Sequence, residues 1–190
     1  MQNHKKRLGQ HFLHDNNIIK KIIMSVQPKE NDHFLEIGPG DGAFLLELSP
    51  NFDRVIALDN SEAMLNKASQ LIFDKKIGNV EFILGDTTSK KLQGLEADAA
   101  VINMVLHHTP DPKQMIADTS ALLAPGGALV ITELCSHGQA WARKFCGDLW
   151  LGFEPDQVNS WCQVAGLKEV ANSHIAQRNG FQIQVRLYKR

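Results

Sequence analysis

The chain has 190 residues, of which 43% are hydrophobic and 22% charged, and its formal net charge is −1. This length supports a real hydrophobic core, and the composition is ordinary for a globular domain. No apolar run approaches the roughly 20 residues of a membrane-spanning helix. The basic N-terminal stretch lacks the apolar segment of a secretory signal, and the 3 cysteines form no close pair, so we expect a cytoplasmic protein with reduced thiols.

Basic charge is concentrated at the N-terminus. Residues 1–21 contain five Lys or Arg and one acid, Asp15, whereas residues 22–190 have a balance of −5. A basic arm on an acidic body is typical of a protein with an anionic partner such as RNA. A solvated tail is the alternative, because runs of charge usually face water.

Apolar spacing and turn signals predict alternating helices and strands. An N-terminal helix is expected from Asp15 to the residue before Pro28. Pro125-Gly126-Gly127 is expected to separate a helix from the fifth strand, and Asn179-Gly180 to join the last two strands in a hairpin. Strands are predicted at 34–37, 55–59, 80–84, 97–104, 128–134, 168–175 and 181–188, and further helices at 44–48, 62–72, 112–123, 136–151 and 155–165.

Five strand-then-helix units in succession predict an α/β fold. We expect a Rossmann-like, doubly wound, mostly parallel sheet of seven strands, closed by a C-terminal antiparallel hairpin. No repeat or low-complexity linker interrupts the chain, so residues 1–190 are interpreted as one domain, with residues 1–28 forming a basic arm and helix. Ligands of such sheets bind beyond the carboxyl ends of the parallel strands.

The first predicted strand runs directly into a glycine-rich turn. Residues 33–42 read HFLEIGPGDG, with Glu36 ahead of Gly38, Gly40 and Gly42. Glycines at such a turn allow backbone angles and close approaches that a Cβ would forbid. A strand, a glycine turn and a helix together favour a site for a nucleotide-like ligand.

Two acids follow the next strands at the same predicted edge. Asp59 ends the second strand and can accept hydrogen bonds from ribose hydroxyls, although it can also cap the following helix with Ser61. Asp86 follows the third strand, ahead of Thr87, and can accept from an adenine amine, although an ordinary turn aspartate is the alternative.

Several motifs resemble those of S-adenosylmethionine-dependent methyltransferases of the class I, Rossmann-like type. They read VIALDNSEAML, NVEFILGDTT, VINMVLHHTPDPKQMI and ALLAPGGALVITEL, and the resemblance covers about residues 33–170. The ubiquinone/menaquinone-biosynthesis (type 11-like) group and methyltransferases fused to arsenic-type repressors are the most similar. The acid before the glycine turn, GDTT and LLAPGGALVI favour this class over nicotinamide dehydrogenases.

The first 50 residues resemble another methyltransferase family, the rRNA adenine dimethyltransferases. The similar stretch reads KKRLGQHFLHDNNIIKKIIMSV, followed by FLEIGPGDG, and in that family the arm folds over the cofactor. His11 and Leu13 stand at the matching arm positions. After the fourth strand Asn103 matches the family's motif, but Val105 and Leu106 replace its proline and the aromatic that stacks on a flipped adenine.

The resemblance implies a site for S-adenosylmethionine, with S-adenosylhomocysteine as product, and in-line transfer of the methyl group. Such a reaction depends mainly on positioning the reactants and excluding water, so no metal is expected. The residues expected to bind the cofactor are His11, Leu13, Glu36, Gly38, Pro39, Gly40, Asp59, Asn60, Met64, Asp86, Thr87, Asn103 and Met104.

The His107-His108 pair follows the fourth predicted strand. Either residue can act as a base that removes a proton from the acceptor, because histidine titrates near neutrality. A hydrogen-bonded packing role is the alternative, and a metal site is disfavoured because no third ligand of suitable spacing is visible. The aromatic residues Trp141, Phe145, Trp150 and Trp161 are candidates either for an acceptor pocket or for the core.

Three functions stay open from sequence. The leading one is methyl transfer to a small, partly apolar acceptor. The second is methylation of adenine in RNA, which the basic arm favours. The third is a non-catalytic cofactor-binding module, because no unambiguous base is present.

Overall fold

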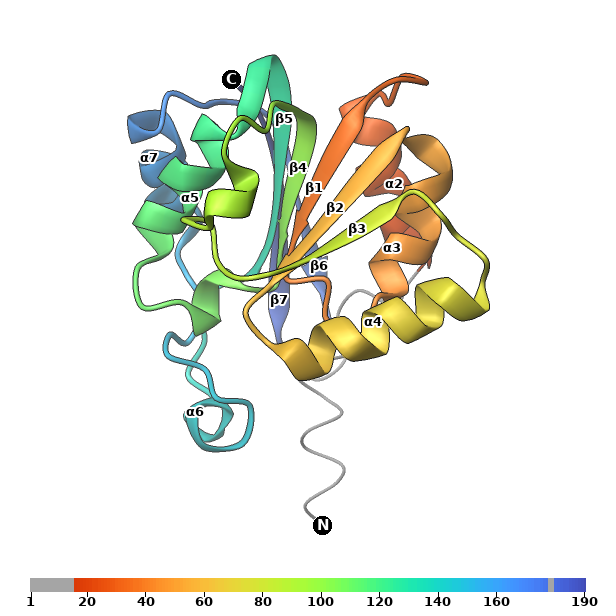
Figure 1. The fold of residues 1–190 in the computed structure, drawn as a ribbon. Helices are drawn as coiled ribbons and strands as arrows, with labels where there is room; N and C mark the ends of the chain where they lie inside the picture. Colours follow the sequence, from red (N-terminus) through yellow and green to blue (C-terminus); the bar gives the residue numbers. More distant parts are fainter. Residues whose placement is uncertain (1–15, 178–179) are drawn as a thin grey trace.

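The computed structural model describes residues 16–177 and 180–190. Seven strands form one sheet in the order β3-β2-β1-β4-β5-β7-β6 (Figure 1). The first five strands pair in parallel, and β7 pairs antiparallel with both β5 and β6. This arrangement confirms the predicted doubly wound, mostly parallel sheet and its C-terminal antiparallel hairpin.

The observed elements follow the predicted order closely. The strands are β1 His33–Ile37, β2 Arg54–Asp59, β3 Val80–Leu84, β4 Ala97–Asn103, β5 Leu123–Leu134, β6 Lys168–Ala176 and β7 Gln182–Lys189. The α-helices are α2 Asn16–Val26, α3 Ala43–Leu48, α4 Glu62–Asp74, α5 Pro112–Ala121, α6 Trp141–Phe145 and α7 Pro155–Val164. Short 3-10 turns are η1 Ser49–Asn51, η2 Lys90–Leu92 and η3 Leu106–His108.

Alternating strand residues divide the core into two layers. Phe34 of β1 packs in the layer that contains α2, α3 and α4 side chains, whereas the adjacent Leu35 packs in the layer with α5 and α7. Figure 1 shows these two helix groups on opposite faces of the sheet. Successive strand side chains point to opposite faces, and burying each large apolar one contributes about 1.5–3 kcal/mol. The sheet is therefore a rigid base for the loops at its carboxyl edge.

Predicted caps fix two helix starts. The hydroxyl of Ser61 accepts a hydrogen bond from the Met64 amide at the start of α4, at 3.4 Å. Asp111 accepts one from the Gln114 amide at the start of α5, at 3.0 Å. Each cap satisfies an amide that the first helical turn leaves without a backbone partner.

The start of the fifth strand was predicted wrongly. β5 begins at Leu123, not at residue 128, and contains Pro125-Gly126-Gly127. Ala97 pairs with Leu123 while Ala99 pairs with Ala128, so the intervening residues bulge out of the ladder. Gly126 has φ +78°, which glycine adopts without strain. The motif therefore makes a bulge within a strand instead of a break before it.

The predicted helix at 136–151 was also wrong. Only α6 is helical there, and Gly147, with φ +81°, follows its end. Residues 136–152, named here the 136–152 loop, leave β5 and return to it, because Cys135 forms an isolated bridge with Phe153. The amides of Leu149 and Trp150 donate to the His107 carbonyl instead of to helical partners. Figure 1 shows α6 projecting beyond the carboxyl edge of the sheet.

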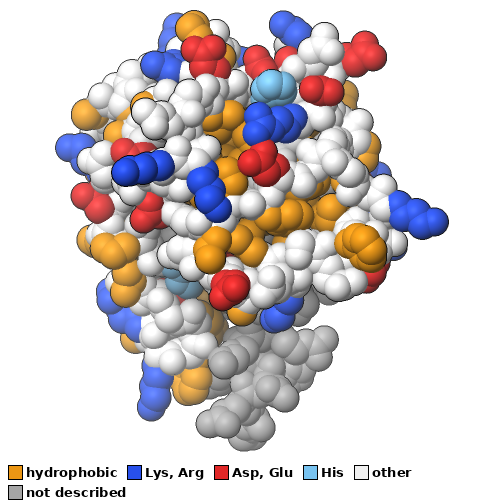
Figure 2. All heavy atoms as spheres, viewed as in Figure 1, with side chains coloured by type: hydrophobic (Ala, Val, Ile, Leu, Met, Phe, Trp, Pro, Cys, Tyr) orange, Lys and Arg blue, Asp and Glu red, His pale blue; other side chains and the backbone are white. Residues whose placement is uncertain are grey.

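Some predictions fall outside the described residues. These are the basic arm with His11 and Leu13, and Asn179 of the predicted hairpin turn. Within residues 16–177 and 180–190, no helix combines the length and the hydropathy needed to cross a membrane. On the face that Figure 2 presents, Lys and Arg are interspersed with Asp and Glu.

Candidate cofactor and acceptor site

The glycine turn after β1 requires glycine at two positions. Gly38 has φ +75°, and a Cβ there would overlap the Val105 side chain. Gly42 has φ +87°, and its Cβ would lie 3.0 Å from the Ala68 Cα atom of α4. Gly40 also has a positive φ, +56°, but its Cβ would meet open space. The turn is thus packed on both sides and open in the middle, where a ligand can approach the backbone.

Glu36 lies beneath this turn and is fully buried. Neither of its carboxylate oxygens has a hydrogen-bond partner. Burial raises the Glu36 pKa to about 8, an interaction with Asn103 partly offsets this rise, and the charges of Asp59 and Asp41 add to it. A buried acceptor without a partner is costly unless a ligand supplies a donor or a positive charge.

Asp59 ends β2 beside the same turn. Its Oδ1 atom accepts a hydrogen bond from the Ser61 amide at 2.9 Å. Partial burial raises its pKa, and backbone hydrogen bonds from Ser61, Gly40 and Asn60 oppose the rise. The carboxylate therefore both orders the entry to α4 and adjoins Gly40. A helix-capping role and a role toward ribose hydroxyls are thus compatible for Asp59.

The other predicted cofactor residues are distributed around this edge. Pro39 is buried, Asn60 is exposed and Met64 is half-buried in the first turn of α4. Asp86 is exposed, and its Oδ1 atom accepts from the Thr88 amide at 2.9 Å and from the Thr88 hydroxyl at 2.6 Å. The hydroxyl of Thr87 donates to Asp118 of α5 at 2.8 Å. Asp86 thus has the hydrogen bonds of a turn aspartate, and its role toward adenine stays a prediction.

Asn103 lies between the glycine turn and the residues that follow β4. Its Oδ1 atom accepts from the Thr132 hydroxyl at 2.8 Å, which orients the amide group toward Glu36. Met104 follows with φ +55°, unusual for a residue with a side chain, and its amide donates to the Thr132 carbonyl at 2.9 Å. The strained residue turns the chain sharply into η3.

His107 is buried against a carboxyl group that the sequence interpretation did not select. Its Nδ1 atom lies 2.5 Å from Oε1 of Glu133, and its amide donates to Oε2 at 3.2 Å. Glu133 is fully buried in β5 and also accepts from the Leu134 amide at 2.6 Å. Burial lowers the pKa of His107, but the negative charge and hydrogen bond of Glu133 outweigh this and raise it overall.

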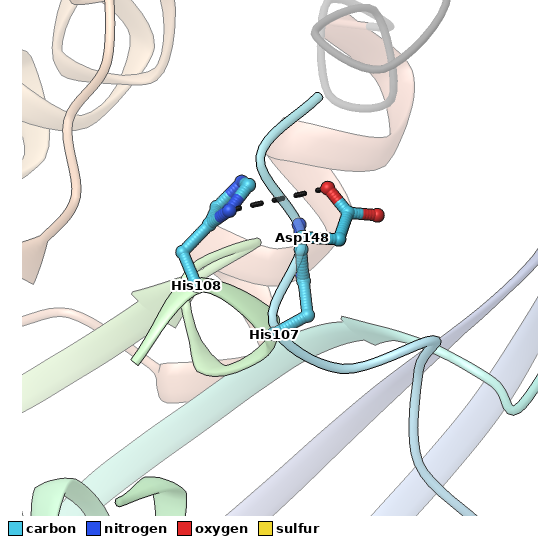
Figure 3. Close-up of side chains that lie close together, drawn as sticks. All are labelled: His107, His108 and Asp148. Carbon is cyan, nitrogen blue, oxygen red and sulfur yellow. Dashed lines mark ion pairs between the residues drawn. The ribbon is translucent and has the colours of Figure 1, made fainter. Parts of the chain in front are cut away.

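His108 and Asp148 complete a second group of polar side chains. His108 Nδ1 lies 3.9 Å from Asp148 Oδ1, and the Asp148 side chain is only 4% exposed. Figure 3 shows that the side chains of His107 and His108, from η3, and of Asp148, from the 136–152 loop, lie close together. Burial and the neighbouring His107 lower the pKa of His108. We name His107, His108 and Asp148 the histidine cluster.

Sequence reasoning missed the two acids of this region for different reasons. Glu133 carried a signal, because a charged residue interrupts the apolar strand ALVITEL. Asp148 carried no such signal, because it lies on the polar face of a predicted helix that does not form.

The aromatic candidates have different environments. Trp161 packs against Phe153 in the core, whereas Trp150 is 40% exposed and donates to the Thr109 carbonyl.

A family model for the methyltransferase domain matches residues 35–131. The chain belongs to this methyltransferase domain family. The match and the fold confirm the class that the motifs predicted, the Rossmann-like methyltransferases that depend on S-adenosylmethionine.

Curated relatives are methyltransferases of ribosomal RNA. Ribosomal RNA small subunit methyltransferase A of Xylella fastidiosa (strain Temecula1) is 31% identical over 160 residues, which cover 73% of this chain and 60% of that protein. Its counterpart in Chlorobium phaeobacteroides (strain BS1) is 54% identical over 61 residues, or 28% of this chain and 23% of that protein. The chain therefore spans less than two thirds of these relatives.

Solved structures share the fold at low sequence identity. N-methyltransferase NodS from Bradyrhizobium japonicum WM9, in complex with S-adenosylhomocysteine, has a TM-score of 0.73 and 22% identity over 95% of this chain and 89% of that one. The (4+2)-cyclase SpnF has a TM-score of 0.80 and 14% identity over 92% of this chain and 80% of that one. Because one of these is a cyclase, the shared fold does not by itself define the reaction.

Proposed function

We propose that the chain transfers a methyl group from S-adenosylmethionine to a small, partly apolar acceptor. The observation that carries the proposal is Glu36, a fully buried carboxyl group beneath the glycine turn whose oxygens make no hydrogen bond of standard geometry and whose polar neighbour is the Asn103 side chain. Asp59 and Asn103 lie close enough to influence its pKa. A ligand with hydroxyls and a positive charge matches these acceptors.

The residues at this edge fit S-adenosylmethionine, which supplies a methyl group activated by a positively charged sulfur. Glu36 would face a cationic part of the cofactor, Asp59 would accept from the ribose hydroxyls, and the open side of Gly40 would allow close contact. The chain's contribution is to orient the two reactants and to exclude water.

The acceptor would bind beyond Asn103, beside the histidine cluster. No aromatic residue occupies the two positions after Met104, where Val105 is half-buried and Leu106 fully buried. The 136–152 loop adds the exposed apolar side chains of Leu149 and Trp150. Acceptance of a proton by His107 or His108 stays a proposal that rests on their position.

The test is transfer of a labelled methyl group from S-adenosylmethionine to fractions of a cell extract separated into small molecules and RNA. Label in an apolar small-molecule fraction supports the leading proposal. Label in no fraction would favour the non-catalytic module instead. Asp59→Ala serves as the matched variant, and it should reduce transfer to any acceptor.

Methylation of adenine in RNA is the second candidate. It is supported by the similarity to ribosomal RNA methyltransferases, 31% identical over 160 residues. This function predicts RNA binding that weakens steeply with salt and drops when residues 1–13 are deleted. Absence of RNA binding at low salt would rule it out, whereas RNA that accepts the label would replace the leading proposal.

A further inference from the structure

We propose that His107, His108 and Asp148 bind a divalent first-row transition-metal ion. Each residue can offer one ligand atom, and these atoms all lie within 4.8 Å of one another. Two imidazole nitrogens and one carboxylate oxygen are a common ligand set for zinc and for ferrous iron. Metal binding does not depend on the proposed function. The catalytic role of the metal, given below, does rest on the proposed function.

The ligand atoms of the histidine cluster lie within 4.8 Å of one another and must move closer together to bind a metal. Tetrahedral zinc with bonds of about 2.0–2.2 Å holds its ligand atoms about 3.3 Å apart. His108 Nδ1 and Asp148 Oδ1 are 3.9 Å apart. His108 belongs to a short turn and its side chain is 43% exposed, so it can move toward the other two ligands.

Glu133 provides the support that a metal-binding histidine usually has. Its carboxylate holds Nδ1 of His107 at 2.5 Å. This contact leaves Nε2 as the His107 atom for a metal and fixes the orientation of the ring. Metal-bound histidines commonly donate their second nitrogen to a carboxylate in this way.

Asp148 gives a second, independent reason to infer a cation at this position. Its side chain is 4% exposed, and its Oδ1 atom is buried without a hydrogen-bond partner. Leaving such an oxygen unsatisfied is costly, and more so for a charged group. Together with Glu133 it places two carboxyl groups in the interior near His107. A divalent cation would balance this charge and bind the oxygen that lacks a hydrogen-bond partner.

The proposed ion would bind on the acceptor side of Asn103. Three protein ligands leave a coordination position open, as in catalytic metal sites. A hydroxyl or thiol of the acceptor bound there would have a lowered pKa and would release its proton to solvent. The resulting anion would form the new bond to the methyl carbon while the carbon–sulfur bond breaks and its electron pair stays on sulfur. Such a site would replace a base as the means of activating the acceptor.

The test uses the full chain, stripped with a chelator and then titrated with Zn²⁺ by calorimetry and with Co²⁺ by visible absorption. We expect one ion per chain and at least tenfold weaker binding in His108→Ala and in Asp148→Asn. His174→Ala is the matched control, because His174 is an exposed histidine on β6, and it should bind like the wild type. Mg²⁺ should not compete.

Two outcomes would overturn the inference. One is no stoichiometric binding of Zn²⁺ or Co²⁺, and the other is equal binding in the wild type and His108→Ala. Titration of the stripped protein with S-adenosylmethionine separates this inference from the proposed function. Cofactor binding without metal binding leaves the proposed function standing alone, and metal binding without cofactor binding leaves the metal site alone.

Discussion

The two halves of the carboxyl edge are built in different ways. On the half proposed to bind the cofactor, Glu36, Gly38 and Gly40 are neighbours in the chain, and the backbone angles of the two glycines belong to one turn. On the acceptor half, the histidine cluster forms only because the 136–152 loop returns to β5 and brings Asp148 to η3. A local motif specifies the first half, whereas closure of a distant loop specifies the second. Changes in one half should therefore leave the other half largely intact.

The largest effects on stability are expected at glycines with a positive φ, and the first of these lie in the glycine turn. Gly38→Ala imposes a positive φ on alanine and overlaps Val105, so it should lower the free energy of unfolding by about 2–5 kcal/mol. Gly40→Ala has the same strain but open space, and should cost about 1–2 kcal/mol. Denaturant unfolding measures both. Equal losses would show that packing against Val105 does not constrain the turn.

A matched pair tests the acceptor half. A Cβ at Gly152, where φ is +73°, would overlap the Cys135 carbonyl, whereas Gly147 has φ +81° and open space. Gly152→Ala should cost about 2–5 kcal/mol, because a backbone carbonyl cannot move aside as a side chain can, and Gly147→Ala should cost about 1–2 kcal/mol. Gly152→Ala should also weaken Zn²⁺ binding and leave cofactor affinity within twofold of the wild type. Loss of cofactor affinity in this variant would contradict the independence of the two halves.

Glu36 predicts a dependence of stability on pH. Its folded pKa is raised from 4.5 to about 8, so between these values the folded chain holds a proton that the unfolded chain releases. Stability then falls as pH rises, by at most about 1.4 kcal/mol per pH unit. Glu36→Gln removes the titrating group and with it this pH dependence. The free energy of unfolding of Glu36→Gln, relative to that of the wild type, should therefore increase from pH 5 to pH 8.

The control for this prediction is Glu62→Gln, at an exposed position of α4. Its stability relative to the wild type should be nearly independent of pH over the same range. The wild type should also bind S-adenosylmethionine more weakly as pH falls below 8, because a protonated Glu36 cannot pair with a cation. A constant stability difference for Glu36→Gln between pH 5 and 8 would contradict the raised pKa.

The smallest effect is expected at Asp86. The residue is exposed and already accepts two hydrogen bonds from Thr88. One further hydrogen bond to adenine contributes about 0.5–1.5 kcal/mol, so Asp86→Ala should weaken S-adenosylmethionine binding roughly two- to tenfold. Thr88→Val, which keeps the carboxylate but loses one turn contact, should have less effect in the same titration. The reverse order would assign Asp86 to the turn alone.

Most of the fold could be predicted because its signals are local. Buried strands, the caps Ser61 and Asp111, and the glycine turn each depend on adjacent residues. The 136–151 helix failed because its amphipathic pattern is only a local preference. Tertiary contacts, including the amide bonds from Leu149 and Trp150 to His107, decided the structure there.

The candidate site divides along the same boundary. Glu36 and Asp59 could be selected because strand ends meet at one edge of a parallel sheet. Asp148 could not, since it lies 40 residues beyond His108 in the chain and reaches η3 only through the loop's return. Burial of the polar side chains of Gln184 and Arg186 in β7 was likewise not apparent from the alternation of apolar and polar residues. These side chains are buried in the fold, where β7 lies between β5 and β6 in the sheet.

Calorimetric titration of S-adenosylmethionine into Asp59→Ala and Asp148→Asn tests the division between the two halves most directly. Asp59→Ala should weaken the affinity at least tenfold, because it removes the proposed acceptor for the ribose hydroxyls. Asp148→Asn should stay within twofold of the wild type, because its side chain serves the acceptor half. Unchanged affinity in Asp59→Ala, or an equal loss in both variants, would contradict the assignment of the cofactor to the glycine-turn half.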